Sequence, residues 1–108
     1  MPLLLVTTTC ATREEAERLG RTLVAERLAA CAQIGGPITS HYWWEGRLDQ
    51  ATEWVCQLKT DTAVYDSLEV RLRALHAYDV PEVTAVPVER GFTGYLEWVQ
   101  DIVAGTQR

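Results

Sequence analysis

The order of its strand-like and helix-like segments constrains the fold of this chain more than any other feature of the sequence. Segments that alternate or are rich in β-branched residues, which is typical of strands, lie at residues 3–10, 30–44, 48–60 and 83–88. Segments with apolar residues at helical spacing lie between the first and second strand and between the third and fourth, at 13–29 and 64–75. This order predicts an α+β fold, a ferredoxin-like βαββαβ sandwich whose antiparallel sheet carries both helices on one face.

Capping and helix-breaking residues bound the predicted helices. Thr12 stands three residues before Glu15, the spacing of a capping box, so the first helix should begin there and run to near Ala29. The second helix cannot continue past Pro81, because proline lacks the amide hydrogen that helical hydrogen bonding uses. A short third helix near the C-terminus is predicted from the helical spacing of Tyr95, Val99 and Ile102, with Trp98 beside them.

The hairpin between the second and third strands carries an unusual run of aromatic residues. Glu45-Gly46 marks its tight turn, and Tyr42-Trp43-Trp44 comes directly before it. Consecutive strand residues point to opposite faces of a sheet, and two helices on one side cannot cover both faces. The chain is therefore predicted to be a homo-oligomer in which other subunits cover the second face, and the alternative is that the terminal helix folds back over it.

Length, charge and composition favour one cytoplasmic domain. The 108 residues are enough for a single core, so residues 1–108 are predicted to form one domain. A net charge of −5 and the lack of a basic cluster with interleaved aromatics argue against a nucleic-acid partner. The apolar run at the start is short and is not preceded by basic residues, so we expect neither a leader nor a membrane anchor. Cys10, Cys31 and Cys56, an odd number at wide spacings, are expected to be reduced thiols acting as small core residues.

The residues after the second helix are the candidates for metal chemistry. The imidazole of His76 suits Cu(II) or Zn(II), and Asp79 and Glu82 could complete such a site with carboxylate oxygens. The alternative is that His76 caps the last helical carbonyls or forms a hydrogen bond at a subunit contact. The sequence has no asparagine, only two serines, and none of the nucleophile, zinc-protease or phosphate-loop motifs. We therefore predict a protein that is not an enzyme and that requires no cofactor.

Several blocks of the sequence resemble the CutA divalent-cation tolerance family. The resemblance covers almost the whole chain, and its blocks occur in the family's order and spacing. It implies a ferredoxin-like fold in a tight homotrimer, with a cytoplasmic role in tolerance of divalent metals, often copper. The matching blocks are Glu26-Arg27-Leu28-Ala29-Ala30-Cys31, Tyr42-Trp43-Trp44-Glu45-Gly46, Leu58-Lys59-Thr60, His76-Ala77-Tyr78-Asp79-Val80-Pro81-Glu82, Val86-Pro87 and Tyr95-Leu96-Glu97-Trp98.

The resemblance also directs attention to subunit contacts and to departures from the family pattern. Ala77 replaces the proline of the family's His-Pro-Tyr motif, while Thr8 and Leu75 stand where some members carry a cysteine and a second histidine. The resemblance also implies an architecture similar to that of trimeric nitrogen-regulatory signalling proteins. An alternative function is therefore a signalling or scaffold trimer that binds a small ligand between subunits or presents a surface to a protein partner. The residues expected at the trimer interface and its cleft are Tyr42, Trp43, Trp44, Trp54, Lys59 and Tyr78.

Overall fold

The computed structural model describes residues 2–105. The α+β class and the predicted order of elements are confirmed, with a third helix at the C-terminal end. The prediction of one domain over 1–108 includes Met1 and residues 106–108, which lie outside the described residues. No helix within the described range is long and apolar enough to cross a membrane. The elements are β1 (Leu3–Cys10), α1 (Arg13–Ala25), β2 (Cys31–Trp44), β3 (Arg47–Asp61), α2 (Tyr65–Leu75), β4 (Thr84–Val88) and α3 (Thr93–Val103).

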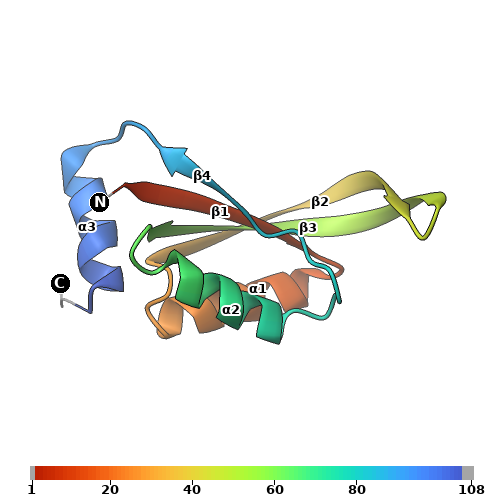
Figure 1. Cartoon of the computed structure of the whole chain (residues 1–108), viewed down its shortest axis with the longest axis horizontal. Coiled ribbons are helices and arrows are strands. Elements are labelled where there is room, and N and C mark those ends of the chain that lie inside the picture. Colours follow the sequence, from red (N-terminus) through yellow and green to blue (C-terminus); the bar gives the residue numbers. More distant parts are fainter. Residues whose placement is uncertain (1, 106–108) are drawn as a thin grey trace.

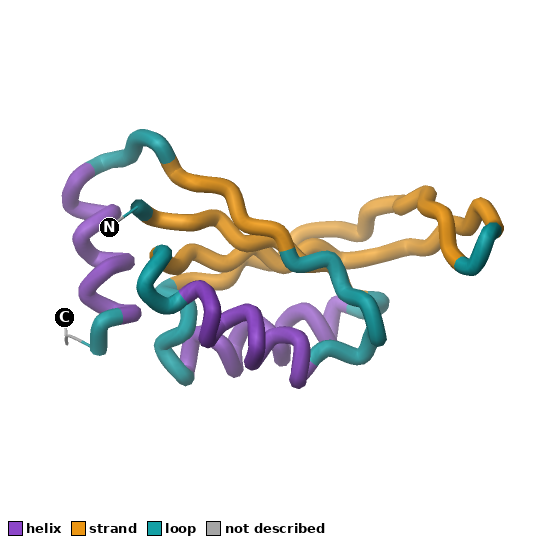
Figure 2. Tube along the Cα trace, in the orientation of Figure 1, coloured by secondary structure: helices purple, strands orange, loops and turns teal. Residues whose placement is uncertain are grey.

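The four strands form one antiparallel sheet in the order β2-β3-β1-β4. Helices α1 and α2 lie side by side on one face of it, as predicted, and α3 stands across the end of the sheet where β1 begins (Figures 1 and 2). The opposite face of the sheet carries neither α1 nor α2. We call this surface the open face.

The main core lies between the sheet and the first two helices. Its fully buried members come from β1, β3, α1 and α2, and include Val6, Leu23, Leu58, Leu68 and Leu72. A second, smaller cluster joins α3 to the start of β1 through Leu3, Ala30, Val99 and Val103. Helix α3 thus packs at one end of the sheet. It does not cover the exposed Tyr42, Trp43 and Trp44, so the alternative in which the terminal helix folds back over the second face does not account for the aromatic hairpin.

The first helix is shorter than predicted. Thr12 caps it as expected, because its hydroxyl accepts a hydrogen bond from the amide of Glu15 at 3.1 Å. The helix ends at Ala25 rather than near Ala29, and Arg27 adopts a left-handed φ of 59° that turns the chain back toward the sheet. The apolar residues after Arg27 also fit helical spacing, but here they pack into the core where the chain returns to β2.

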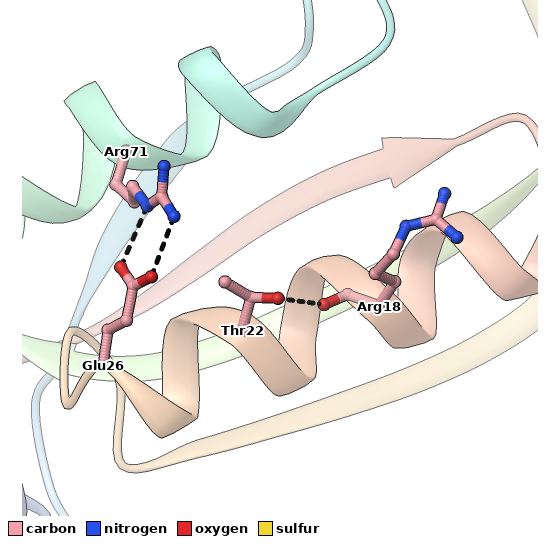
Figure 3. A network of polar contacts seen from close by, with 4 residues as sticks. All are labelled: Arg18, Thr22, Glu26 and Arg71. Carbon is pink, nitrogen blue, oxygen red and sulfur yellow. Dashed lines mark hydrogen bonds and ion pairs between the residues drawn. The ribbon is translucent and has the colours of Figure 1, made fainter.

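An ion pair joins α1 to α2. Arg71 of α2 donates from Nε and Nη2 to the two carboxylate oxygens of Glu26 at the end of α1, both at 2.9 Å (Figure 3). Within α1, the hydroxyl of Thr22 donates to the carbonyl of Arg18 at 2.8 Å. The two-pronged ion pair fixes where the C-terminal end of α1 sits against α2.

The β2–β3 hairpin extends well beyond the rest of the sheet. Strand β1 pairs with β3 only from Trp54 to Asp61, so residues 38–53 pair with nothing but each other. We call residues 38–53 the arm; it is the long projection in Figure 1. Its two-residue turn has positive φ at Glu45 and Gly46, which confirms the predicted tight hairpin. The register between β2 and β3 shifts between Gly35 and Ile38, at the base of the arm.

Candidate functional site

His76 lies where the exit from α2 meets the end of β1. It is the residue that ends α2, and both of its ring nitrogens bind backbone groups. Nε2 lies 2.8 Å from the carbonyl oxygen of Thr9, and Nδ1 lies 3.1 Å from the amide nitrogen of Tyr78. A carbonyl can only accept and an amide can only donate, so the ring is neutral, with its hydrogen on Nε2. His76 thereby joins β1 to the segment that follows α2.

A small cavity of about 170 Å³ opens beside this histidine, between α1, the end of β1 and the exit of α2. The Sγ atom of Cys10 is 3.8 Å from Nε2 of His76, and both residues line the cavity. The wall thus combines a thiol and an imidazole with charged and apolar groups. The full lining is Cys10, Glu15, Arg18, Leu19, Thr22, Leu75, His76 and Ala77.

The electrostatic setting of Cys10 is negative. Burial, followed by the charges of Glu15 and Glu53, raises the pKa of its thiol to about 11. Cys10 is therefore a protonated thiol at neutral pH and a poor nucleophile. The sequence prediction of a small core residue describes its burial but not its histidine neighbour.

Tyr78 connects this region to the base of the arm. Its hydroxyl donates to Oε2 of Glu53 at 2.9 Å, and its ring lies 4.9 Å from that of His76. Burial, followed by the hydrogen bond to Glu53 and its charge, holds the pKa of Tyr78 far above the usual tyrosine value. Glu53 is only 8% exposed. A nearly buried carboxylate is thus held by a tyrosine that comes from the segment after α2.

The residues predicted to bind Cu(II) or Zn(II) do not come together. Asp79 and Glu82 are exposed, and Glu82 accepts a 3.4 Å hydrogen bond from Thr84. Both nitrogens of His76 are occupied, and no group of three or more His, Cys, Asp or Glu side chains within residues 2–105 is arranged to hold a metal ion. The residues present therefore do not fit a ready-made divalent site at His76, Asp79 and Glu82. The alternative, a hydrogen-bonding histidine, describes the contacts seen within this chain.

The predicted interface residues occupy four different settings. Tyr42, Trp43 and Trp44 are exposed on the arm, and Trp43 is 73% exposed. Trp54 packs at the edge of the chain's own core, with the guanidinium of Arg13 5.7 Å from the centre of its ring.

Lys59 faces away from the two helices. It alternates along β3 with the buried Leu58 and Thr60, and its ammonium donates to Oε1 of Gln33 at 2.7 Å. Lys59 is therefore on the open face. Tyr78 lies in the segment after α2, where its hydroxyl contacts Glu53 at the base of the arm.

Three features of this region could not be predicted from the sequence. Cys10 and His76 are 66 residues apart, and Glu53 and Tyr78 are 25 apart, so no local spacing indicates either pair. Thr8, on the same side of β1 as Cys10, has a buried hydroxyl with no hydrogen-bond partner among the described residues. The apolar residues around Thr8 in the sequence do not indicate that its hydroxyl lacks a partner.

Fold and contacts together define a class: small α+β proteins with a two-helix layer, an open sheet face and a long β2–β3 arm. A family model described as "CutA1 divalent ion tolerance protein" matches residues 4–102. A divalent-cation tolerance protein CutA from Archaeoglobus fulgidus is 39% identical over 90 residues, which cover 83% of this chain and 87% of the relative. The chain belongs to the CutA1 divalent ion tolerance protein family.

Solved structures agree with this assignment. The crystal structure of CutA from Xylella fastidiosa superposes with a TM-score of 0.90 at 36% identity and covers 94% of this chain and 97% of that one.

A plant relative is longer than this chain. The chloroplastic CutA 1 of rice is 39% identical over 101 residues, or 94% of this chain. The chain spans only 57% of the length of that rice protein.

Proposed function

We propose that this chain forms a ferredoxin-like homotrimer that acts without catalysis in cytoplasmic tolerance of divalent cations, copper among them. Membership of the CutA1 family supports the tolerance role. The observation that supports assembly is the arm, which extends beyond the sheet with large apolar side chains in solvent. Trp43 is 73% exposed and its cross-strand partner Leu48 is 67% exposed.

The open face supplies a second uncovered surface. Leu5 of β1 and Val86 of β4 are partners in register on this face, and Val86 is 53% exposed. Isolated apolar residues are common on protein surfaces, but a projecting arm combined with an uncovered sheet face is typical of an interface. Copies of the same chain are the natural cover, because each one brings both an arm and an open face.

The tolerance role does not depend on chelation by His76, Asp79 and Glu82, which the structure keeps apart. Within this proposal, the trimer is the functional unit and the cleft beside the arm is where subunits meet. Glu53 and Tyr78 lie at the base of the arm, so they would border that cleft. Assembly would therefore change the surroundings of the Glu53 carboxylate and the Tyr78 hydroxyl.

Two measurements test this proposal. Light scattering coupled to size exclusion should give three times the mass of the chain at micromolar concentration, and a well-folded monomer would refute the assembly. Deleting the gene should lower growth in elevated Cu(II) or Zn(II), and a plasmid copy should restore it. Growth that is unchanged by the deletion across several divalent metals would refute the tolerance role, and fractionation of the cells would test the cytoplasmic location.

A further inference from the structure

Lys59 places a positive charge on the open face. It is the only lysine of the sequence and lies on β3, between β1 and β2 (Figure 1). Its partners in register are Leu5 on β1 and Cys31 on β2, and paired residues of neighbouring strands point to the same side of a sheet. Its other neighbours on this face, none of which is charged, include Gln33, Gln57 and Val86.

No carboxylate neutralises this ammonium within the chain. Lys59 is half-buried, donates to Oε1 of Gln33 at 2.7 Å and takes part in no ion pair among residues 2–105. Asp61, two residues further along β3, is 5% exposed and already accepts from the amide of Val64 at 3.1 Å. If another copy covers the open face, the ammonium is removed from water, which is strongly destabilising without a counter-charge. The covered face therefore needs an anion beside Lys59.

The hydrogen-bond donors around Lys59 suit an anion. The ammonium has three N–H donors, of which Gln33 uses one. Gln33 accepts through Oε1, so the two N–H groups of its amide have no partner among the described residues. Lysine and amide N–H groups left unused at one place on a surface are typical of sites for carboxylates and phosphates.

Tyr95 of α3 borders the same place. Burial, followed by the charge of the Cys31 thiol and a hydrogen bond with it, raises the pKa of Tyr95, so its hydroxyl stays protonated at neutral pH. Since Cys31 is the register partner of Lys59, this hydroxyl lies on the β2 side of the ammonium. The ring of Tyr95 is 40% exposed, and its centre is 5.7 Å from that of Trp98.

Apolar groups therefore flank the donors on both sides. Leu5 and Val86 lie on the β4 side of Lys59, and the ring of Tyr95 lies on the β2 side. Small-molecule sites combine such apolar walls with a few polar groups that fix the ligand's orientation. We propose that Lys59 and Gln33 bind the carboxylate or phosphate group of a small organic anion, which is enclosed when a second copy covers the open face.

This inference rests on the proposed assembly, because a single copy leaves the site open to water. It adds a class of ligand to the proposed trimer and involves no metal ion. The competing partner for Lys59 is a carboxylate of the second copy, since the arm carries the exposed Glu45 and Asp49. A soluble anion can bind Lys59 only if no such side chain already occupies the site.

The test is an NMR titration of the assembled full-length chain with phenyl phosphate and, separately, with benzoate. Because Lys59 is the only lysine, labelling with ¹⁵N-lysine leaves a single backbone amide signal to follow. This signal should shift and saturate with at least one of the two anions, and the comparison tells phosphate from carboxylate. Benzylamine, a cation of similar shape, should leave the signal in place. An equal shift with benzylamine, or no saturable shift with either anion, would overturn the proposal.

Calorimetric titration of the preferred anion then compares variants. Lys59→Met should weaken binding by at least about tenfold, whereas Lys59→Arg keeps the charge and should still bind. Arg73→Met, which removes an exposed cation on α2, is the matched control and should bind like wild type. Equal affinity in Lys59→Met and wild type would refute the site.

Sedimentation velocity on the same samples separates this inference from the proposed function. Without added anion, Lys59→Met should assemble at least as tightly as wild type, because an unpaired ammonium no longer has to be covered. Loss of assembly in Lys59→Met would show that a carboxylate of the second copy holds Lys59 and would overturn the proposal. A trimeric wild type that binds neither anion refutes this site alone, whereas a monomeric wild type refutes the assembly and with it the enclosed site.

Discussion

Replacing Trp43 by alanine should separate the subunits. Trp43 is 73% exposed in the isolated chain. A side chain of this size buries about 200 Å² when fully covered, so a neighbouring subunit could remove roughly 150 Å² more from water. At about 25 cal/mol/Å² this is worth at most about 3.8 kcal/mol per subunit, and alanine would keep little of it. A loss of that size weakens each contact by two to three orders of magnitude.

Sedimentation velocity over a range of concentrations is the appropriate assay. Wild type should stay assembled to low concentration, whereas Trp43→Ala should dissociate into folded monomers with unchanged far-UV circular dichroism. Val70→Ala is the control, because Val70 is 68% exposed on α2, on the side of the molecule away from the open face. If Trp43→Ala assembles as tightly as Val70→Ala, the arm is not the contact and the reasoning from exposed aromatic area fails.

Three further predictions concern stability. A Cβ at Gly20 would lie 2.9 Å from a side chain of β2, so Gly20→Ala should cost about 1–3 kcal/mol in urea unfolding, and unchanged stability would contradict the close approach of α1 to the sheet. Arg71 lowers the pKa of the Glu26 carboxyl, so the stability from this pair is present at neutral pH and is lost as pH falls through the lowered pKa. The Tm values of wild type and Arg71→Ala should accordingly differ at neutral pH and converge in acid, and a constant difference would rule the pair out. Burial raises the pKa of Cys56 from 9.0 to about 12, so the unfolded chain ionises first and this thiol destabilises the fold as pH rises above 9.0. Cys56→Ala should lose less stability than wild type between neutral pH and pH 10, and equal losses would contradict the burial argument.

The periodic parts of the fold could be predicted because they depend on local rules. The capping hydroxyl of Thr12, the two-residue turn at Glu45-Gly46 and the apolar spacing of α2 each act over a few residues, and all three are present in the structure. The predicted end of α1 lies beyond the observed one. Residues 28–30 are apolar, and apolar residues fit either a continued helix or a packed return to the sheet. Only the left-handed turn at Arg27, which depends on docking the chain against β3, decides between them.

The candidate site could not be predicted because it depends on tertiary contacts. His76 was identified from its residue type, but its partners are backbone atoms of Thr9 and Tyr78 and a thiol on the first strand. Acidic neighbours in sequence suggested a metal site with Asp79, yet that side chain points to solvent. Proximity in sequence was a poor guide here, since the segment after α2 crosses the end of β1 before it reaches β4.

The segment after α2 gives a physical route between the cavity and the arm. The amide of Tyr78 binds His76, and its hydroxyl binds Glu53 at the base of the arm. The second bond lies where the proposed trimer forms its cleft, so its loss should weaken the assembly. Tyr78→Phe, which removes the donor to the nearly buried carboxylate of Glu53, should therefore weaken the association measured by sedimentation velocity, and association as tight as that of wild type would refute this link.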